Sequence, residues 1–145
     1  MKGVSFVLAG SYTHTIDAKN RVFMPAKHRE KLGPSFIITK GVDKCLMVYS
    51  MEEWEKYSAK LEAISPTKAR DIIRFIYANA IEAIPDAQGR VLLSPELVAH
   101  ADLKKNVTII GCSNHAEIWD ADAWAEKNSG TNADGILAQM IELGM

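Results

Sequence analysis

The sequence predicts a mixed α+β fold, mostly β-structure, built from two tandem copies of one supersecondary unit. The segment 17–24, Asp-Ala-Lys-Asn-Arg-Val-Phe-Met, returns 69 residues later at 86–93 as Asp-Ala-Gln-Gly-Arg-Val-Leu-Leu. Around it lie short segments that alternate in polarity, a period typical of β-strands. Each copy needs the other to bury its apolar face, so the two repeats are expected to share one core.

The first repeat, residues 11–54, carries the signals of several strands and one short helix. Its elements are expected in the order strand 11–16, turn 17–20, return strand 22–24 of a hairpin, helix 25–33, and strands 36–39 and 46–49. Proline suits the first position of a helix and glycine suits its end, so Pro25 and Gly33 bound the short helix.

The turn of each repeat is predicted to need a backbone conformation with positive φ. Asn20 and Gly89 occupy the same repeat position, and these two residue types tolerate positive φ best. Arg21 and Arg90 follow directly, so each arginine is expected to begin a paired strand.

The connecting segment 55–79 is predicted to be helical and to pack outside the repeats. Ser50 and Glu53 form a capping box at the start of a first helix, and Ser65-Pro66 starts a second. Aromatic residues such as Trp54 could stack on the bases of single-stranded nucleic acid. Their matched repeat positions favour packing in the core instead.

The second repeat, residues 80–124, is expected to repeat the same elements. Strands are predicted at 80–85, 90–93, 107–110 and 117–119, with a helix from Pro95 and another capped by Asp120. The tail, residues 125–145, is predicted to contain a mobile linker at 128–135. A short amphipathic helix is predicted at 136–143, either docked on a neighbouring molecule or frayed.

Composition is that of an ordinary soluble protein, with 48% hydrophobic and 24% charged residues. No apolar run approaches the ~20 residues of a membrane helix, and the stretch 4–9 is short for the core of a signal peptide. We therefore expect a cytoplasmic protein with no membrane partner. The histidines lack metal-ligand spacing, and Cys45 and Cys112 are expected to be reduced, packed thiols. No metal or other cofactor is predicted.

Charge is distributed unevenly between the repeats. Residues 1–44 carry eight Lys or Arg against three acids, a net charge of +5. Residues 80–124 carry three Lys or Arg against seven acids, a net charge of −4. Attraction to phosphate depends on the local field of a basic face, so the first repeat is expected to do most of any DNA binding.

Residues 10–29 resemble the first motif of the MraZ family, 86–93 its second motif, and 117–124 the end of its second repeat. The resemblance covers most of the chain. It implies a pseudo-twofold, swapped-hairpin barrel of SpoVT-AbrB type and a ring-shaped homo-oligomer. It also implies transcriptional regulation through repeated promoter boxes upstream of the division and cell-wall gene cluster. Two positions depart from the family pattern: Asn20 replaces a glycine, and Ser94 replaces a proline.

Five basic residues are the candidate DNA contacts: Lys19, Arg21, Lys27, Arg29 and Arg90. An arginine at a turn can reach phosphates or fork onto a guanine edge, and two antiparallel strands fit the major groove. The alternative for Arg21 is an ion pair with Asp17 that only fixes the turn. Arg90 lies among acids, so a structural or interface role competes equally with DNA contact. Lys27 and Arg29 could be phosphate contacts or ordinary solvated charges.

We expect no enzyme and no small-molecule substrate, because the sequence has no nucleophile-elbow pattern and no phosphate-binding glycine-rich loop. The predicted function is sequence-specific binding of double-stranded DNA by a nucleoid-associated transcriptional regulator. One alternative is an oligomeric scaffold of the same fold that does not bind DNA. Another is binding of single-stranded nucleic acid or RNA.

Overall fold

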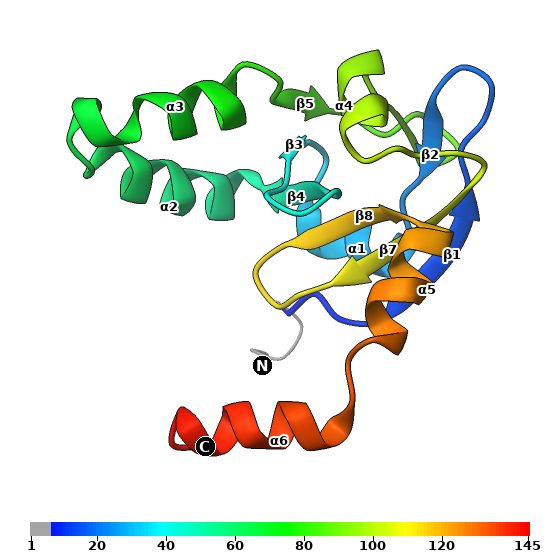
Figure 1. The fold of residues 1–145 in the computed structure, drawn as a ribbon. Coiled ribbons are helices and arrows are strands. Elements are labelled where there is room, and N and C mark those ends of the chain that lie inside the picture. The colour runs from blue at the N-terminus through cyan, green and yellow to red at the C-terminus, as the bar shows by residue number, and fades with distance from the viewer. Residues whose placement is uncertain (1–6) are drawn as a thin grey trace.

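The computed structural model describes residues 7–145, with strands at the centre and helices outside (Figure 1). Lys2 and residues 4–6 of the short apolar segment lie outside the described residues. The chain begins with β1 (Ser11–Thr15), β2 (Arg21–Phe23), α1 (Ala26–Leu32), β3 (Phe36–Lys40), β4 (Leu46–Ser50), α2 (Met51–Glu62) and α3 (Pro66–Tyr77). It continues with β5 (Ile81–Ala83), β6 (Arg90–Leu92), α4 (Pro95–His100), β7 (Asn106–Gly111), β8 (Ala116–Asp120), α5 (Ala121–Ser129) and α6 (Ala133–Glu142).

The strands form a six-stranded antiparallel sheet and a separate two-stranded ribbon. The order in the sheet is β1-β7-β8-β4-β3-β5, and the ribbon pairs β2 with β6. The first strand of each repeat therefore pairs with the third strand of the other, as β1 does with β7 and β5 with β3. This order reads the same when the two repeats are exchanged.

Two sequence-based expectations about the strands need correction. The hairpin predicted within the first repeat is reduced to a single bridge between Ile16 and Val22, because β2 pairs across the repeats with β6. The expected closed barrel is also not formed by the described residues, since β1 and β5 remain the two edges of the sheet. After the turns at 17–20 and 86–89 the chain leaves the sheet. Strand β2 of the first repeat then pairs with the equivalent strand β6 of the second.

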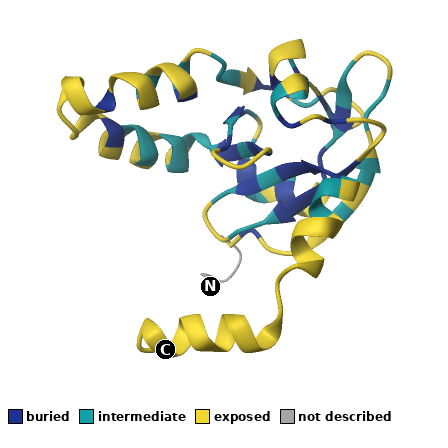
Figure 2. Cartoon of the chain, viewed as in Figure 1, coloured by how far each residue is buried: buried dark blue, intermediate teal, exposed yellow. Residues whose placement is uncertain are grey.

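The hydrophobic core lies between the ribbon and the sheet, and residues of both repeats contribute to it. Val22 and Val91 face inward from the ribbon and are fully buried, as are Phe36, Ile38 and Ile118 of the sheet. Figure 2 shows this buried centre in dark blue. The prediction that the two repeats share one core is confirmed.

Helices α2 and α3 form a hairpin that extends to one side of the sheet (Figure 1). The Ser50 hydroxyl accepts a hydrogen bond from the Glu53 N–H at 3.2 Å and caps α2, and Pro66 occupies the start of α3. Tyr49 of β4 stacks on Tyr57 of α2, with ring centroids 5.1 Å apart. Trp54 also packs on Tyr49, with ring centroids 5.9 Å apart, so its predicted packing role is confirmed.

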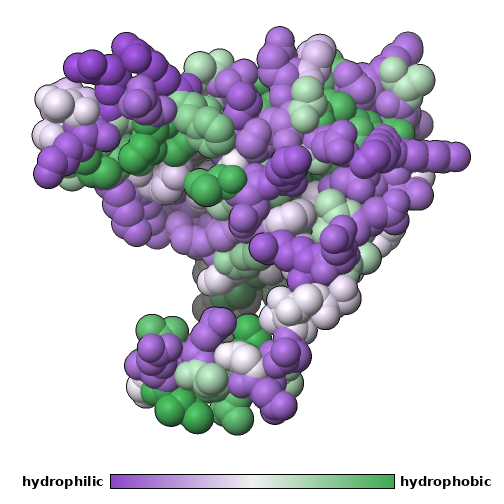
Figure 3. All heavy atoms as spheres, viewed as in Figure 1, coloured by the Kyte–Doolittle hydropathy of each residue, from purple (hydrophilic) through white to green (hydrophobic). Residues whose placement is uncertain are grey.

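The C-terminal segment is more helical than predicted. Helix α5 extends to Ser129, so the linker expected at 128–135 is reduced to residues 130–132, and Asn132 caps α6 by accepting from the Gly135 N–H at 2.7 Å. No α6 residue is buried, and Figures 1 and 3 show the helix as a separate lobe with apolar side chains. Within residues 7–145 no helix is both long and apolar enough to cross a membrane.

Candidate nucleic-acid interface

In the first repeat, Asp17 organises the turn that leads to Arg21. Its Oδ1 accepts hydrogen bonds from the Lys19 and Arg21 backbone N–H groups, both at 2.9 Å. Its Oδ2 accepts from the Arg21 Nε at 2.7 Å. The hydrogen bond from the Arg21 backbone is the main cause that lowers the pKa of Asp17. The carboxylate therefore fixes both the turn and the direction of the arginine.

The second repeat reproduces this geometry atom for atom. Asp86 Oδ1 accepts from the Gln88 and Arg90 backbone N–H groups at 2.9 Å, and its Oδ2 accepts from the Arg90 Nε at 2.9 Å. Arg90 Nη1 also lies 3.9 Å from Asp17 Oδ2, so the two turns contact each other. We call residues 17–21 and 86–90 the Asp–Arg turns.

Both Asp–Arg turns have the predicted backbone conformation. The φ angle is 61° at Asn20 and 83° at Gly89. Asparagine tolerates this left-handed region better than most residues, which explains how it can stand at a glycine position. The carbonyl oxygens of Asn20 and Gly89 accept from Leu93 and Met24 N–H groups at 2.9 Å, which joins each turn to the opposite strand.

The ribbon of β2 and β6, called here the arginine ribbon, presents both arginines on its outer face. Arg21 pairs with Leu92, and Phe23 pairs with Arg90. Successive strand residues point to opposite faces. Because Val22 and Val91 are fully buried on the inner face, the other four residues face outward. The Arg21 and Arg90 side chains are 30% and 31% exposed, so both can be reached by a ligand.

The free atoms of Arg21 are the ones that suit recognition of a base or a phosphate. Among the described residues, Arg21 uses only its Nε as a side-chain hydrogen-bond donor, and that bond goes to Asp17. Its two terminal Nη groups remain available as a fork of parallel donors, the arrangement that binds guanine O6 and N7 or two phosphate oxygens. A guanidinium already oriented by a carboxylate loses less side-chain entropy on binding.

The other three predicted contacts differ in their surroundings. Lys19 and Lys27 are exposed, on the first Asp–Arg turn and at the start of α1. Arg29 is more constrained, because its Nε donates to the Met24 carbonyl at 2.9 Å and its guanidinium lies 5.4 Å from the Phe23 ring centroid. Arg29 therefore supports Phe23 on the arginine ribbon. Sequence reasoning missed Phe23 as an outward residue, although the two-residue alternation with Val22 indicates it.

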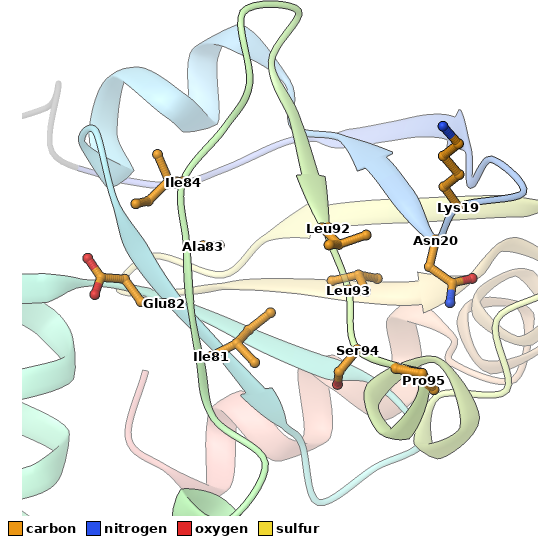
Figure 4. Close-up of a pocket in the computed structure, with 10 residues that line it drawn as sticks. All are labelled: Lys19, Asn20, Ile81, Glu82, Ala83, Ile84, Leu92, Leu93, Ser94 and Pro95. Carbon is orange, nitrogen blue, oxygen red and sulfur yellow. The ribbon is translucent and has the colours of Figure 1, made fainter.

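An apolar hollow of about 600 Å³ opens beside the first Asp–Arg turn (Figure 4). Lys19 and Asn20 line one side, with Ile84 and Leu92 among the lining residues from the second repeat. Ile84 and Leu92 are 68% and 63% exposed. The arginine ribbon thus has an uncovered apolar surface next to its charged face.

Comparison with known proteins identifies the family of this chain. The model of the family described as "MraZ protein, putative antitoxin-like" matches the chain twice, at residues 7–75 and 76–134. The chain belongs to the MraZ family. The double match agrees with the duplication found in the sequence and with the duplicated Asp–Arg turns.

Named relatives in this family resemble the chain over most of its length. A protein of Thermoanaerobacter sp. (strain X514) named "Transcriptional regulator MraZ" is 48% identical over 128 residues, which are 87% of this chain and 90% of the relative. A protein of the same name from Acetivibrio thermocellus is 44% identical over 140 residues, covering 94% and 98%. MraZ proteins are thus named as regulators and not as enzymes.

Proposed function

We propose that this MraZ protein is a transcriptional regulator that binds double-stranded DNA in a sequence-specific manner. The observation that carries the proposal is the arginine ribbon, on which Arg21 and Arg90 are each oriented by a carboxylate on one outward face. A two-stranded antiparallel ribbon fits the major groove, where an arginine fork reads guanine. Partly exposed Phe23 and exposed Leu92 would contact thymine methyl groups or sugars beside it.

Lys19 and Lys27 are assigned to the phosphate backbone. Both are exposed, and both belong to the basic first repeat, whose segment 1–44 has a net charge of +5. Phosphate contacts set the position of the protein, whereas base contacts set the sequence. Arg29 is assigned mainly to positioning Phe23, because its Nε is already bonded to the Met24 carbonyl.

The family resemblance supports the finer parts of the proposal. We interpret the exchanged strands as the swapped-hairpin arrangement of SpoVT-AbrB type, and the targets as repeated promoter boxes of the division and cell-wall gene cluster. The protein would then act in the cytoplasm, on the nucleoid. No cofactor is needed for this activity, since charge and hydrogen bonding supply the recognition.

A ring-shaped homo-oligomer is part of the same proposal. Helix α6 has ten residues, and Ile136, Leu137, Met140 and Ile141 on it are all exposed. An isolated helix this short is marginal in water, so tertiary packing must supply most of its stability. A neighbouring copy in the ring would cover these side chains. Several arginine ribbons in one particle would also multiply the affinity for tandem boxes.

The second candidate function is an oligomeric scaffold that uses the fold without binding DNA. The apolar hollow beside Lys19 and the uncovered α6 favour it, because both suit contacts between proteins. A scaffold function requires no free guanidinium group on Arg21. Replacement of Arg21 therefore separates the two functions.

The test measures binding to tandem boxes from the DNA upstream of the protein's own gene by fluorescence anisotropy. Arg21→Ala is expected to lower the affinity at least about 10-fold, since a bidentate base contact contributes ~1–3 kcal/mol. Arg90→Ala is expected to lower it less. Arg70→Ala, which removes the same charge from an exposed position on α3, is the matched control and should change it little.

Thermal denaturation of the same variants checks that the fold persists. An ion pair that is about a third exposed contributes under ~1 kcal/mol, so Arg21→Ala should retain nearly the full unfolding temperature. Affinity equal to wild type in Arg21→Ala, at physiological salt, would favour the scaffold over the regulator.

A further inference from the structure

The hairpin between β7 and β8 brings together three side chains that are common metal ligands. Cys112, His115 and Glu117 each offer one ligand atom, and these atoms all lie within 4.8 Å of one another. All three residues are partly buried, so they are sheltered yet reachable. The sequence does not indicate this cluster by histidine spacing or by a Cys-x-x-Cys pair, because each of its three ligands is a different residue type.

The duplicated hairpin of the first repeat shows that the fold does not require these residues. The Gly41 N–H donates to the Cys45 carbonyl at 2.8 Å, and the Cys112 N–H donates to the His115 carbonyl at 2.8 Å. Gly41, Cys45 and, two residues later, Met47 therefore stand where the second repeat has Cys112, His115 and Glu117. A hairpin with the same closing hydrogen bond, and a turn one residue longer, forms there with two nonpolar residues and a buried thiol.

The residue directly after the first strand of each hairpin is placed so that its side chain points into the hairpin, toward the position of the cluster. A Cβ atom added to Gly41 would lie 2.7 Å from the Cys45 sulfur. Cys112 occupies the equivalent position in the second repeat, where the hairpin turn is one residue shorter than in the first repeat. Its conformation is fixed by two hydrogen bonds between Ser113 and Leu8, at 2.8 and 2.9 Å.

Neighbouring groups orient two of the three ligands. The Trp119 indole donates to Glu117 Oε1 at 2.9 Å, which leaves Oε2 facing His115 Nε2 at 3.1 Å. His115 Nδ1 lies 2.8 Å from the Asn114 side-chain oxygen. A hydrogen bond on the second ring nitrogen or second carboxylate oxygen is the usual support of a metal ligand.

We propose that Cys112, His115 and Glu117 bind one divalent transition-metal ion, with Zn²⁺ the best match. Thiolate, imidazole and carboxylate are the three protein ligands of Zn²⁺, and a water molecule completes a tetrahedral site. Two ligands about 2.05 Å from a tetrahedral ion stand about 3.3 Å apart, close to the His115–Glu117 separation of 3.1 Å. On binding, the Cys112 thiol loses its proton to solvent, whereas histidine binds neutral and glutamate as the carboxylate.

A hydrogen-bonded ion pair between His115 and Glu117 is the competing explanation of this geometry. It accounts for the 3.1 Å contact but assigns no role to the Cys112 sulfur. The two explanations therefore differ in what Cys112 does. A metal ion needs the sulfur, and an ion pair does not.

The experiment is a titration of the reduced, tag-free full chain with Co²⁺, followed by absorbance. A tetrahedral site with a thiolate gives visible d–d bands and a sulfur-to-cobalt charge-transfer band in the near ultraviolet. We expect saturation at one Co²⁺ per chain. Zn²⁺, which has no geometric preference from its d electrons, is expected to displace the Co²⁺ and bleach the bands.

Two ligand variants and one control decide between the explanations. Cys112→Ser should abolish the charge-transfer band, and Glu117→Gln should weaken Co²⁺ affinity at least about 10-fold. Cys45→Ala, which removes the buried thiol of the other hairpin, should keep the full spectrum. Circular dichroism confirms that each variant is folded.

The proposal is overturned by either of two results. One is a wild-type chain that shows no stoichiometric Co²⁺ spectrum, which would leave only the ion pair. The other is a charge-transfer band that survives in Cys112→Ser, which would place the metal elsewhere on the chain.

Discussion

Gly89 is the residue whose replacement tests the second Asp–Arg turn most directly. Its φ of 83° lies in the left-handed region, and an added Cβ would lie 2.9 Å from both Arg29 Cζ and Phe23 Cε1. Gly89→Ala therefore imposes two separate costs. One is the backbone conformation, and the other is displacement of the Arg29 guanidinium from the Phe23 ring.

The size of the effect follows from these two contacts. An L-residue in the left-handed region costs roughly 1–2 kcal/mol. Moving Arg29 also breaks its hydrogen bond to the Met24 carbonyl, and a bond of this kind contributes about 1–2 kcal/mol. We expect Gly89→Ala to lower the free energy of unfolding by about 2–4 kcal/mol. For a chain of 145 residues this lowers the Tm by roughly 8–16 °C, at about 4 °C per kcal/mol.

Thermal and urea denaturation at one fixed protein concentration measure the effect, because the stability of an oligomer depends on concentration. Asn20→Gly is the matched control, since it changes the equivalent position of the first repeat to the residue that the second repeat already uses. Its Tm should stay within about 2 °C of wild type. If Gly89→Ala also stays within that range, Gly89 does not hold the turn at positive φ beside Arg29, and the reasoning fails.

Two further predictions concern the buried histidine and the last helix. Burial lowers the pKa of His28 below its usual 6.5, so the stability present above pH 6.5 is lost as the pH falls toward the lowered pKa. His28→Leu, which installs the residue found at the equivalent position 97, should flatten the decline of Tm between about pH 7 and about pH 5. Ending the chain at Ser129 removes α6, none of whose residues is buried. Light scattering should then show a smaller particle, and circular dichroism should show an unchanged Tm of the remaining fold. An unchanged particle mass would exclude α6 from the ring contacts.

The local features of the fold could be predicted from the sequence because single residues dictate them. Asn20 and Gly89 indicate positive φ, Ser50 indicates a helix start, and Pro66 indicates another. The pairing of β2 with β6 could not be predicted. A strand of three residues shows which face is buried, as at Val22, but its pattern does not specify the partner strand.

The candidate site was predicted in part for a similar reason. Arg21 and Arg90 were located by their turn position, and the structure places both on one ribbon. The Cys112, His115 and Glu117 cluster could not be predicted from spacing within one residue type, because it combines one cysteine, one histidine and one glutamate. The backbone hydrogen bonds show that Gly41 of the first repeat, not a metal ligand, occupies the position of Cys112.

The two Asp–Arg turns have matching hydrogen bonds but belong to repeats of different charge. This difference affects how a loss of DNA affinity in Arg21→Ala or Arg90→Ala should be interpreted. The positions equivalent to Lys19, Lys27 and Arg29 in the second repeat are Gln88, Glu96 and Val98. These three positions carry a formal charge of +3 in the first repeat and −1 in the second, and Arg29 of the first repeat lies beside Gly89 of the second turn. Because the hydrogen bonds of the two arginines match, a larger loss of affinity in Arg21→Ala than in Arg90→Ala would report the field around each arginine. Such a difference should shrink as salt screens the charges. A difference that persists unchanged at high salt would instead mean that the two arginines contact different groups on the DNA.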